Sequence, residues 1–166
     1  MKKLRNVDQA LENFLSRARL LGEKLGPILY QLPPNLHKNE ALLDDFAAGL
    51  PPDLFHVFEF RHASWFDPAI FDIMERRKIA FCIFDAPGRA CPEVVTGDLV
   101  YVRFHGSSQL YSGCYTEEEL ENWAGHIRNL ALGRLAVYAY FNNDAEAFAV
   151  YNAIDLARDI RDLEQR

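Results

Sequence analysis

Five short apolar runs, each ending in polar or ionisable residues, constrain the fold of this chain more than any other feature. Helical patterns separate most of them, and strands that alternate with helices form a parallel sheet with helical crossovers. Ligand sites of such sheets lie at the carboxyl ends of the strands. We therefore expect the five polar endings to meet at one edge. The runs are residues 28–31, 57–62, 81–85, 100–105 and 137–143.

The length of the chain limits how many strands the fold can hold. A complete eight-stranded (β/α) barrel typically needs about 250 residues, and this chain has 166. We expect an α/β fold with about five parallel strands and the helices outside, as a single domain over residues 1–166. Two architectures stay open: an open wound sheet, or a partial TIM-like (β/α) barrel with a gap.

Helix starts are marked by capping residues. Asn39 is placed to cap one helix, and Asp67 followed by proline is placed to cap the next. Thr116 and Glu119 have the spacing of a capping box. Asp144 is expected to cap the last helix, whose N-terminal amides would then assist anion binding beside the strand ends.

Charge and hydropathy narrow the classes of partner. The formal net charge of −6 argues against a broad nucleic-acid surface, which normally shows a basic excess. No apolar run approaches the roughly 20 residues that span a bilayer, and no signal-peptide core follows the N-terminus. We expect a cytoplasmic protein without a membrane partner. We expect Cys82 to be a core residue. Cys91 and Cys114 are expected in loops, where they are either free thiols or joined in a disulfide.

Alternation along each strand predicts which side chains share a face. Residues two apart point to the same side of a strand, so Glu59 shares a face with Arg61, and Arg103 shares a face with His105. Their apolar neighbours should point outwards to the helices. The polar set should then point into the mouth of the barrel. The expected cluster is Glu59, Arg61, Asp85, Arg103, His105 and Asn142.

This mixture of side chains predicts an anion site. Arginine forks match the oxygens of carboxylates and phosphates, so Arg61 and Arg103 are candidate ligand-binding residues. Glu59, Asp85 and His105 are candidate catalytic acids or bases. The alternative is a purely structural network in which the charges pair with one another. No local spacing of metal ligands is present, so we expect no metal, and the sequence names no cofactor.

Together with Arg61 and Arg103, five residues near the strand ends make up the candidate ligand site, and one of them, Asn142, is already part of the expected cluster. They supply amides and aromatic rings, and two have a structural alternative: Trp65 as a packing anchor for the next helix, and Tyr111 as a residue that orders its loop. Gln31 is expected to orient its neighbours through hydrogen bonds. The five are Gln31, Trp65, Tyr111, Asn142 and Asn143.

Four ordered motifs resemble the YecE-like family, catalogued as domain of unknown function 72. They lie at residues 29–34, 58–65, 101–106 and 140–144. The resemblance implies a TIM-like (β/α) barrel with the polar motifs at its mouth. It also implies that the chain corresponds to the C-terminal two-thirds of that barrel and lacks the first three strands. The family brings no established reaction.

Three functions remain open from the sequence. The first is a site for a small phosphate or carboxylate ligand, with or without catalysis. The second is nucleic-acid binding, which the net charge disfavours. The third is a non-catalytic assembly module, because absent strands leave two sheet edges liable to pair with another chain and favour self-association.

Overall fold

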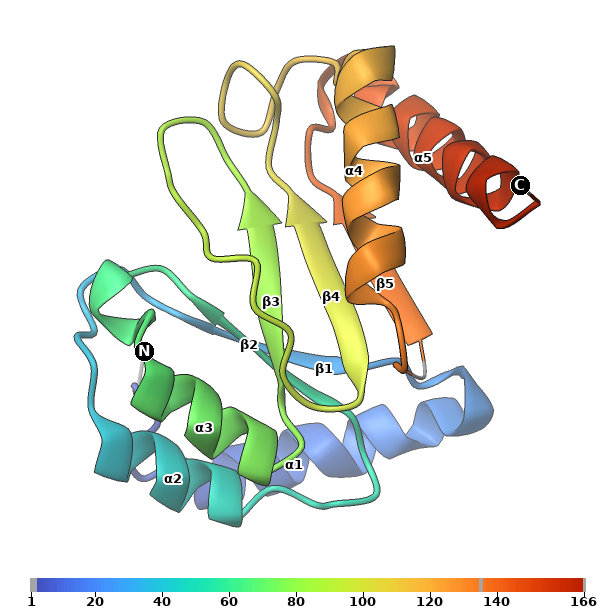
Figure 1. Cartoon of the computed structure of the whole chain (residues 1–166). Coiled ribbons are helices and arrows are strands. Elements are labelled where there is room, and N and C mark those ends of the chain that lie inside the picture. The colour runs from blue at the N-terminus through green and yellow to red at the C-terminus, as the bar shows by residue number, and fades with distance from the viewer. Residues whose placement is uncertain (1–2, 135, 166) are drawn as a thin grey trace.

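The computed structural model describes residues 3–134 and 136–165. Its five strands form one parallel sheet in chain order, so each pairs only with its neighbours in sequence, and the sheet is not closed within the described residues (Figure 1). The predicted α/β fold, an incomplete TIM-like barrel of about five parallel strands, is confirmed. The strands are β1 (Ile28–Leu32), β2 (His56–Phe60), β3 (Ala80–Asp85), β4 (Leu99–Phe104) and β5 (Ala136–Phe141).

Helices precede β1, connect β1 to β2, β2 to β3 and β4 to β5, and follow β5, whereas the described residues 86–98 join β3 to β4 without a helix. Within the described part of the chain, no helix combines the length and the apolar character needed to cross a membrane. The α-helices are α1 (Asp8–Ala18), α2 (Glu40–Ala48), α3 (Pro68–Arg76), α4 (Glu117–Leu130) and α5 (Phe148–Glu164). The 3-10 helices of the described residues are η1 (Arg19–Lys24), η2 (Ala63–Trp65) and η3 (Ala145–Ala147).

Three of the predicted helix caps are present. The side chains of Asn39 and Asp67 each accept a backbone N–H from the first turn of α2 and α3. Thr116 and Glu119 form the reciprocal capping box of α4. These contacts satisfy N–H groups that have no partner inside a helix, which explains why the helices begin there.

The predicted cap of the last helix is wrong. The Asp144 side chain makes no capping hydrogen bond, and η3 follows it instead of an α-helix. Glu146 and Ala147 then have φ angles of +56° and +62°, in the left-handed region, which interrupts the helical path. Because α5 begins only at Phe148, its N-terminus does not start at the end of β5.

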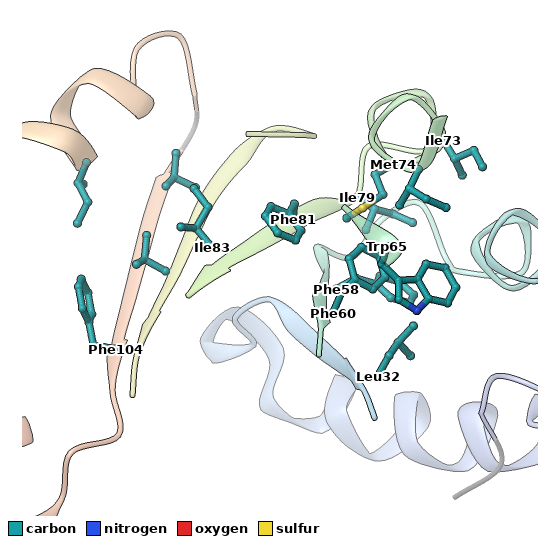
Figure 2. Close-up of a cluster of buried hydrophobic side chains, with 14 of the residues drawn as sticks. Leu32, Phe58, Phe60, Trp65, Ile73, Met74, Ile79, Phe81, Ile83 and Phe104 are labelled. Atoms are coloured by element: carbon teal, nitrogen blue, oxygen red, sulfur yellow. The ribbon is translucent and has the colours of Figure 1, made fainter. Parts of the chain in front are cut away.

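The main core lies between the outer face of the sheet and the helices. Aromatic residues of β2 and β3, including Phe58, Phe60 and Phe81, pack there with side chains of α2 and α3. Figure 2 shows Phe58, Phe60 and Trp65 grouped beside Met74 of α3. This layer fixes which face of each strand is turned inward.

The inner face of the sheet carries a smaller apolar cluster below the polar strand ends. It comprises Val57, Ala80, Cys82, Leu99 and Tyr101, all at most 5% exposed. Strands β2 and β3 pair at only two positions, whereas β4 and β5 pair at six. The sheet therefore opens between β2 and β3 towards their carboxyl ends.

Candidate functional site

A buried carboxylate shared by two arginines forms the centre of the candidate site. Glu59, on the inner face of β2, is fully buried. Its Oε1 is in ion-pair contact with Arg61 Nε, and its Oε2 accepts a hydrogen bond from Arg103 Nη1 at 2.5 Å. The side chains of Arg61 and Arg103 are only 5% and 17% exposed. Glu59 of β2, Arg61 directly after β2 and Arg103 of β4 thus meet inside the curled sheet.

Two amide side chains from the edge strands extend this centre. Gln31 of β1 accepts hydrogen bonds through Oε1 from both Arg61 Nη2 and Arg103 Nη1, each at 3.3 Å. Asn142, directly after β5, accepts one through Oδ1 from Arg103 Nη2 at 2.9 Å. Through Arg103, the cluster links the ends of β1 and β5, which do not pair with each other. We call Gln31, Glu59, Arg61, Arg103, His105 and Asn142 the mouth cluster.

The electrostatics of the cluster keep Glu59 ionised. Burial by itself would raise the pKa of Glu59, but its contact with His105, the hydrogen bond from Arg103 and the positive charges of Arg61 and Arg103 outweigh it. The net result is a pKa below the reference value of 4.5. Glu59 carries one negative charge and Arg61 and Arg103 each carry one positive charge, so the net charge of these three side chains is +1.

His105 lies at the inner end of the same cluster and is fully buried. Its Nε2 is 3.1 Å from Arg61 Nη2 and 3.7 Å from Glu59 Oε1. The rings of Tyr111 and His105 pack edge-to-face, with centroids 5.5 Å apart and planes at 86°. Tyr111 itself is 51% exposed, so it forms the outer rim of the site.

Asp85 does not join the mouth cluster, so its predicted convergence with the arginines is wrong. It lies on the outer face of β3 with Phe81 and Ile83, and its carboxylate accepts hydrogen bonds from the side chains of Tyr115 and Trp123. Burial raises its pKa, although those two hydrogen bonds act in the opposite direction. Asp85 thus anchors the segment around α4.

Trp65 is also outside the site. It is fully buried, its ring stacks on Phe60 with centroids 4.9 Å apart, and its Nε1 donates to the carbonyl of Leu36 at 2.7 Å. Figure 2 shows the indole among the core side chains. The structure places Trp65 in the packing role that the sequence left open, because η2 turns the ring outward.

Asn143 is buried between loops and does not face the mouth cluster. Its Nδ2 donates to the carbonyl of Gly113 at 2.8 Å and to Asn152 Oδ1 at 2.9 Å. Asn152 in turn accepts from the backbone N–H of Tyr115 at 3.1 Å. Asn143 therefore ties the segment after β5 to the loop after β4 and to α5.

Two residues that are not among the predicted site residues border the cluster. Cys82 Sγ lies 3.9 Å from Glu59 Oε2 and forms part of the floor. Tyr140 is 42% exposed and stacks on Tyr101 with centroids 5.1 Å apart. The signal for Tyr140 was present, since it shares a strand face with Asn142.

Metal ligands do not gather anywhere in the described residues. Within residues 3–134 and 136–165, no group of three or more histidine, cysteine, aspartate or glutamate side chains has an arrangement that suits a metal ion. The mouth cluster itself combines two guanidiniums, which repel cations, with one carboxylate. Its donor set suits a negatively charged ligand instead.

The amino-acid sequence is similar to that of a known protein. The chain is 25% identical to the UPF0759 protein YunF of Bacillus subtilis (strain 168), and the match covers 80% of the chain but 57% of YunF. The chain thus spans little more than half the length of this curated relative.

Two solved structures of DUF72 family proteins have a similar fold. One, from Thermotoga maritima MSB8, matches with a TM-score of 0.84 and 23% identity over 99% of this chain and 68% of the other. The second, from Enterococcus faecalis V583, gives a TM-score of 0.82 and 22% identity over 95% of this chain and 67% of the other. The family described as protein of unknown function DUF72 matches residues 1–166, and the chain belongs to that family.

Proposed function

We propose that the mouth cluster binds a small anion, a phosphate or a carboxylate, at the carboxyl ends of the strands. The observation that carries the proposal is the charge balance around Glu59: one buried carboxylate faces two guanidiniums. The net charge of the whole chain is −6, so the excess positive charge is local. An anion would therefore be attracted to the mouth and not to the surface at large.

Hydrogen-bonding capacity also supports an anion. Each guanidinium carries five N–H donors. Arg61 uses three of them on Glu59, Gln31 and His105. Arg103 uses three on Glu59, Gln31 and Asn142. The contacts among the described residues leave the two Nη1 donors of Arg61 and, on Arg103, the Nε donor and one Nη2 donor. The Arg103 pair lies on two neighbouring nitrogens, as bidentate binding of a carboxylate or phosphate requires.

Within this proposal, the candidate acid–base residues have different roles. Glu59 stays ionised and holds both arginines, so it organises the site and is a poor proton donor. His105 contacts the cluster directly and is the residue placed for proton transfer if the bound anion reacts. Asp85, on the other face of the sheet, has no part in it.

Calorimetric titration with inorganic phosphate at low salt tests the proposal. Arg103→Lys keeps the charge beside Glu59 but removes the fork, and we expect phosphate affinity to fall at least about tenfold. Arg77→Lys is the matched control, because Arg77 pairs with Asp44 on the surface at 2.8 Å. Absence of binding to the parent chain at millimolar phosphate, or equal losses in the two variants, refutes the proposal.

Self-association through the sheet edges is a second candidate property. Strands β1 and β5 each have one neighbour in the described sheet, and on β5 Val137 is 36% exposed. Unpaired edges of this kind template pairing with another chain. We expect a second copy to add to this edge, giving a dimer by light scattering that Val137→Lys weakens. A monomer at all accessible concentrations contradicts it.

A further inference from the structure

His105 is a fully buried residue with an unpaired polar atom. Its side chain lies among Arg61, Phe84 and Tyr111. The Nε2 atom faces Arg61 and Glu59, but Nδ1 has no hydrogen-bond partner among the described residues. A buried polar group without a partner is costly, and functional sites are where such costs are tolerated.

The contact with Arg61 determines which nitrogen carries the proton. A guanidinium has donors only, so at 3.1 Å from Arg61 Nη2 the His105 Nε2 must accept. The contact with Glu59 Oε1 is longer, at 3.7 Å, and competes weakly. In a neutral imidazole whose Nε2 accepts, Nδ1 holds the proton. Nδ1 is therefore an N–H donor that has no acceptor in the part of the chain that the structure describes.

Tyr111, whose ring packs edge-to-face with the His105 imidazole, is held in an unusual backbone conformation. Tyr111 has a φ of +62°, in the left-handed region that a bulky residue rarely adopts. Its loop is locked by Gly106, at φ +113°, where an added Cβ would lie 2.1 Å from the carbonyl oxygen of Gln109. Strain of this kind concentrates at ligand-binding segments.

We propose that His105 Nδ1–H donates to a second oxygen of the bound anion, and that Tyr111 is the side chain displaced when that oxygen arrives. This inference rests on the proposed function, because Arg103 supplies the first contact. Arg103 lies in β4 and His105 directly follows that strand. Two residues of extended chain separate their Cα atoms by about 7 Å at roughly 3.3 Å per residue. The ligand class is therefore a short organic anion with a second oxygen group, such as a dicarboxylate of four or five carbons.

Two isosteric variants of His105 separate its two nitrogens. His105→Asn places an amide near the position of Nδ1, whereas His105→Gln places one near Nε2 and leaves the Nδ1 position empty. The probes are glutarate, butyrate as its monoacid counterpart, and inorganic phosphate. We expect the parent to bind glutarate at least about tenfold more tightly than butyrate, a preference that His105→Gln removes and His105→Asn largely retains.

The outcomes distinguish this inference from the function on which it rests. If Arg103→Lys weakens phosphate binding but His105→Gln leaves the glutarate preference unchanged, the inference falls and the anion site stands. If no anion binds the parent, both fall. Nitrogen-15 NMR of the His105 ring gives a readout without ligand: a proton on Nδ1 is expected, and a proton on Nε2 alone overturns the inference. Tyr111→Ala should raise glutarate affinity, and a loss contradicts the covering role.

Discussion

Replacing Glu59 by glutamine should destabilise the fold strongly while keeping its shape. The substitution removes the carboxylate that contacts both Arg61 and Arg103 in the mouth cluster. Charges about 4 Å apart attract by about 4 kcal/mol at the effective dielectric of a protein near its surface. Losing two such pairs is partly offset by the desolvation cost that Glu59 no longer bears. Breaking a buried pair costs about 3–5 kcal/mol, and we expect a loss in that range.

Urea unfolding measures this loss. With a slope of about 2 kcal/mol per molar urea, the midpoint should fall by roughly 2 M. Asp53→Asn is the control, because Asp53 pairs with Arg19 at 2.6 Å on the surface and should leave the midpoint nearly unchanged. Equal midpoints for the Glu59 and Asp53 variants would show that the buried network does not hold the sheet ends together.

The pH dependence of the Glu59 variant provides an independent check. Since the pKa of Glu59 is lowered in the folded chain, its stabilisation is fully present above the reference value of 4.5 and is lost as the pH falls through the lowered pKa. Glu59→Gln should lack this acid-dependent part. Added phosphate should also stabilise the variant more than the parent, because the two guanidiniums are then uncompensated.

Other changes probe the surroundings of the site. Gly106→Ala should lower the free energy of unfolding by about 1–3 kcal/mol, because φ is positive there and the added Cβ would lie 2.1 Å from a carbonyl oxygen. Gly125→Ala in α4, where the added Cβ would meet nothing outside its own helix within 4 Å, should raise it by about 0.5–1 kcal/mol. Equal shifts of the two melting temperatures contradict this. Trp65→Phe should lower the free energy of unfolding, measured in urea, by about 2–3 kcal/mol and leave phosphate affinity unchanged. Weakened phosphate binding would show that Trp65 belongs to the ligand site. Burial raises the pKa of Asp85 above 3.8, so the folded chain loses stability as the pH rises from 3.8 through the raised pKa. Asp85→Asn should flatten this fall in the pH profile of the unfolding free energy, and an unaltered profile refutes the reasoning.

The fold and most of the mouth cluster follow from local sequence signals. Helix caps at Asn39, Asp67 and Thr116 depend only on nearby backbone, so they could be predicted directly. Alternating polar and apolar residues in β2 and β4 show which face turns inward, and this correctly grouped Glu59 with Arg103.

The errors arise where no alternation exists or where a loop sets the direction. In β3 the residues before Asp85 are all apolar, so the sequence could not assign its face, and contacts with Tyr115 and Trp123 decide it. Trp65 and Asn143 follow the ends of strands, where the turn and not the strand period aims the side chain. The cap at Asp144 failed because left-handed residues intervene.

The structural and the anion-binding interpretations of the mouth cluster are not exclusive. Arg103 joins Gln31 of β1 to Asn142 beyond β5, so the network holds together strand ends that the sheet leaves unpaired. A network needed only for that purpose would balance its charges, because a buried unpaired charge is destabilising. Here two guanidiniums share one carboxylate. One positive charge is therefore uncompensated among these three side chains. Under the proposed function a bound anion would compensate it, and phosphate should then stabilise the fold itself.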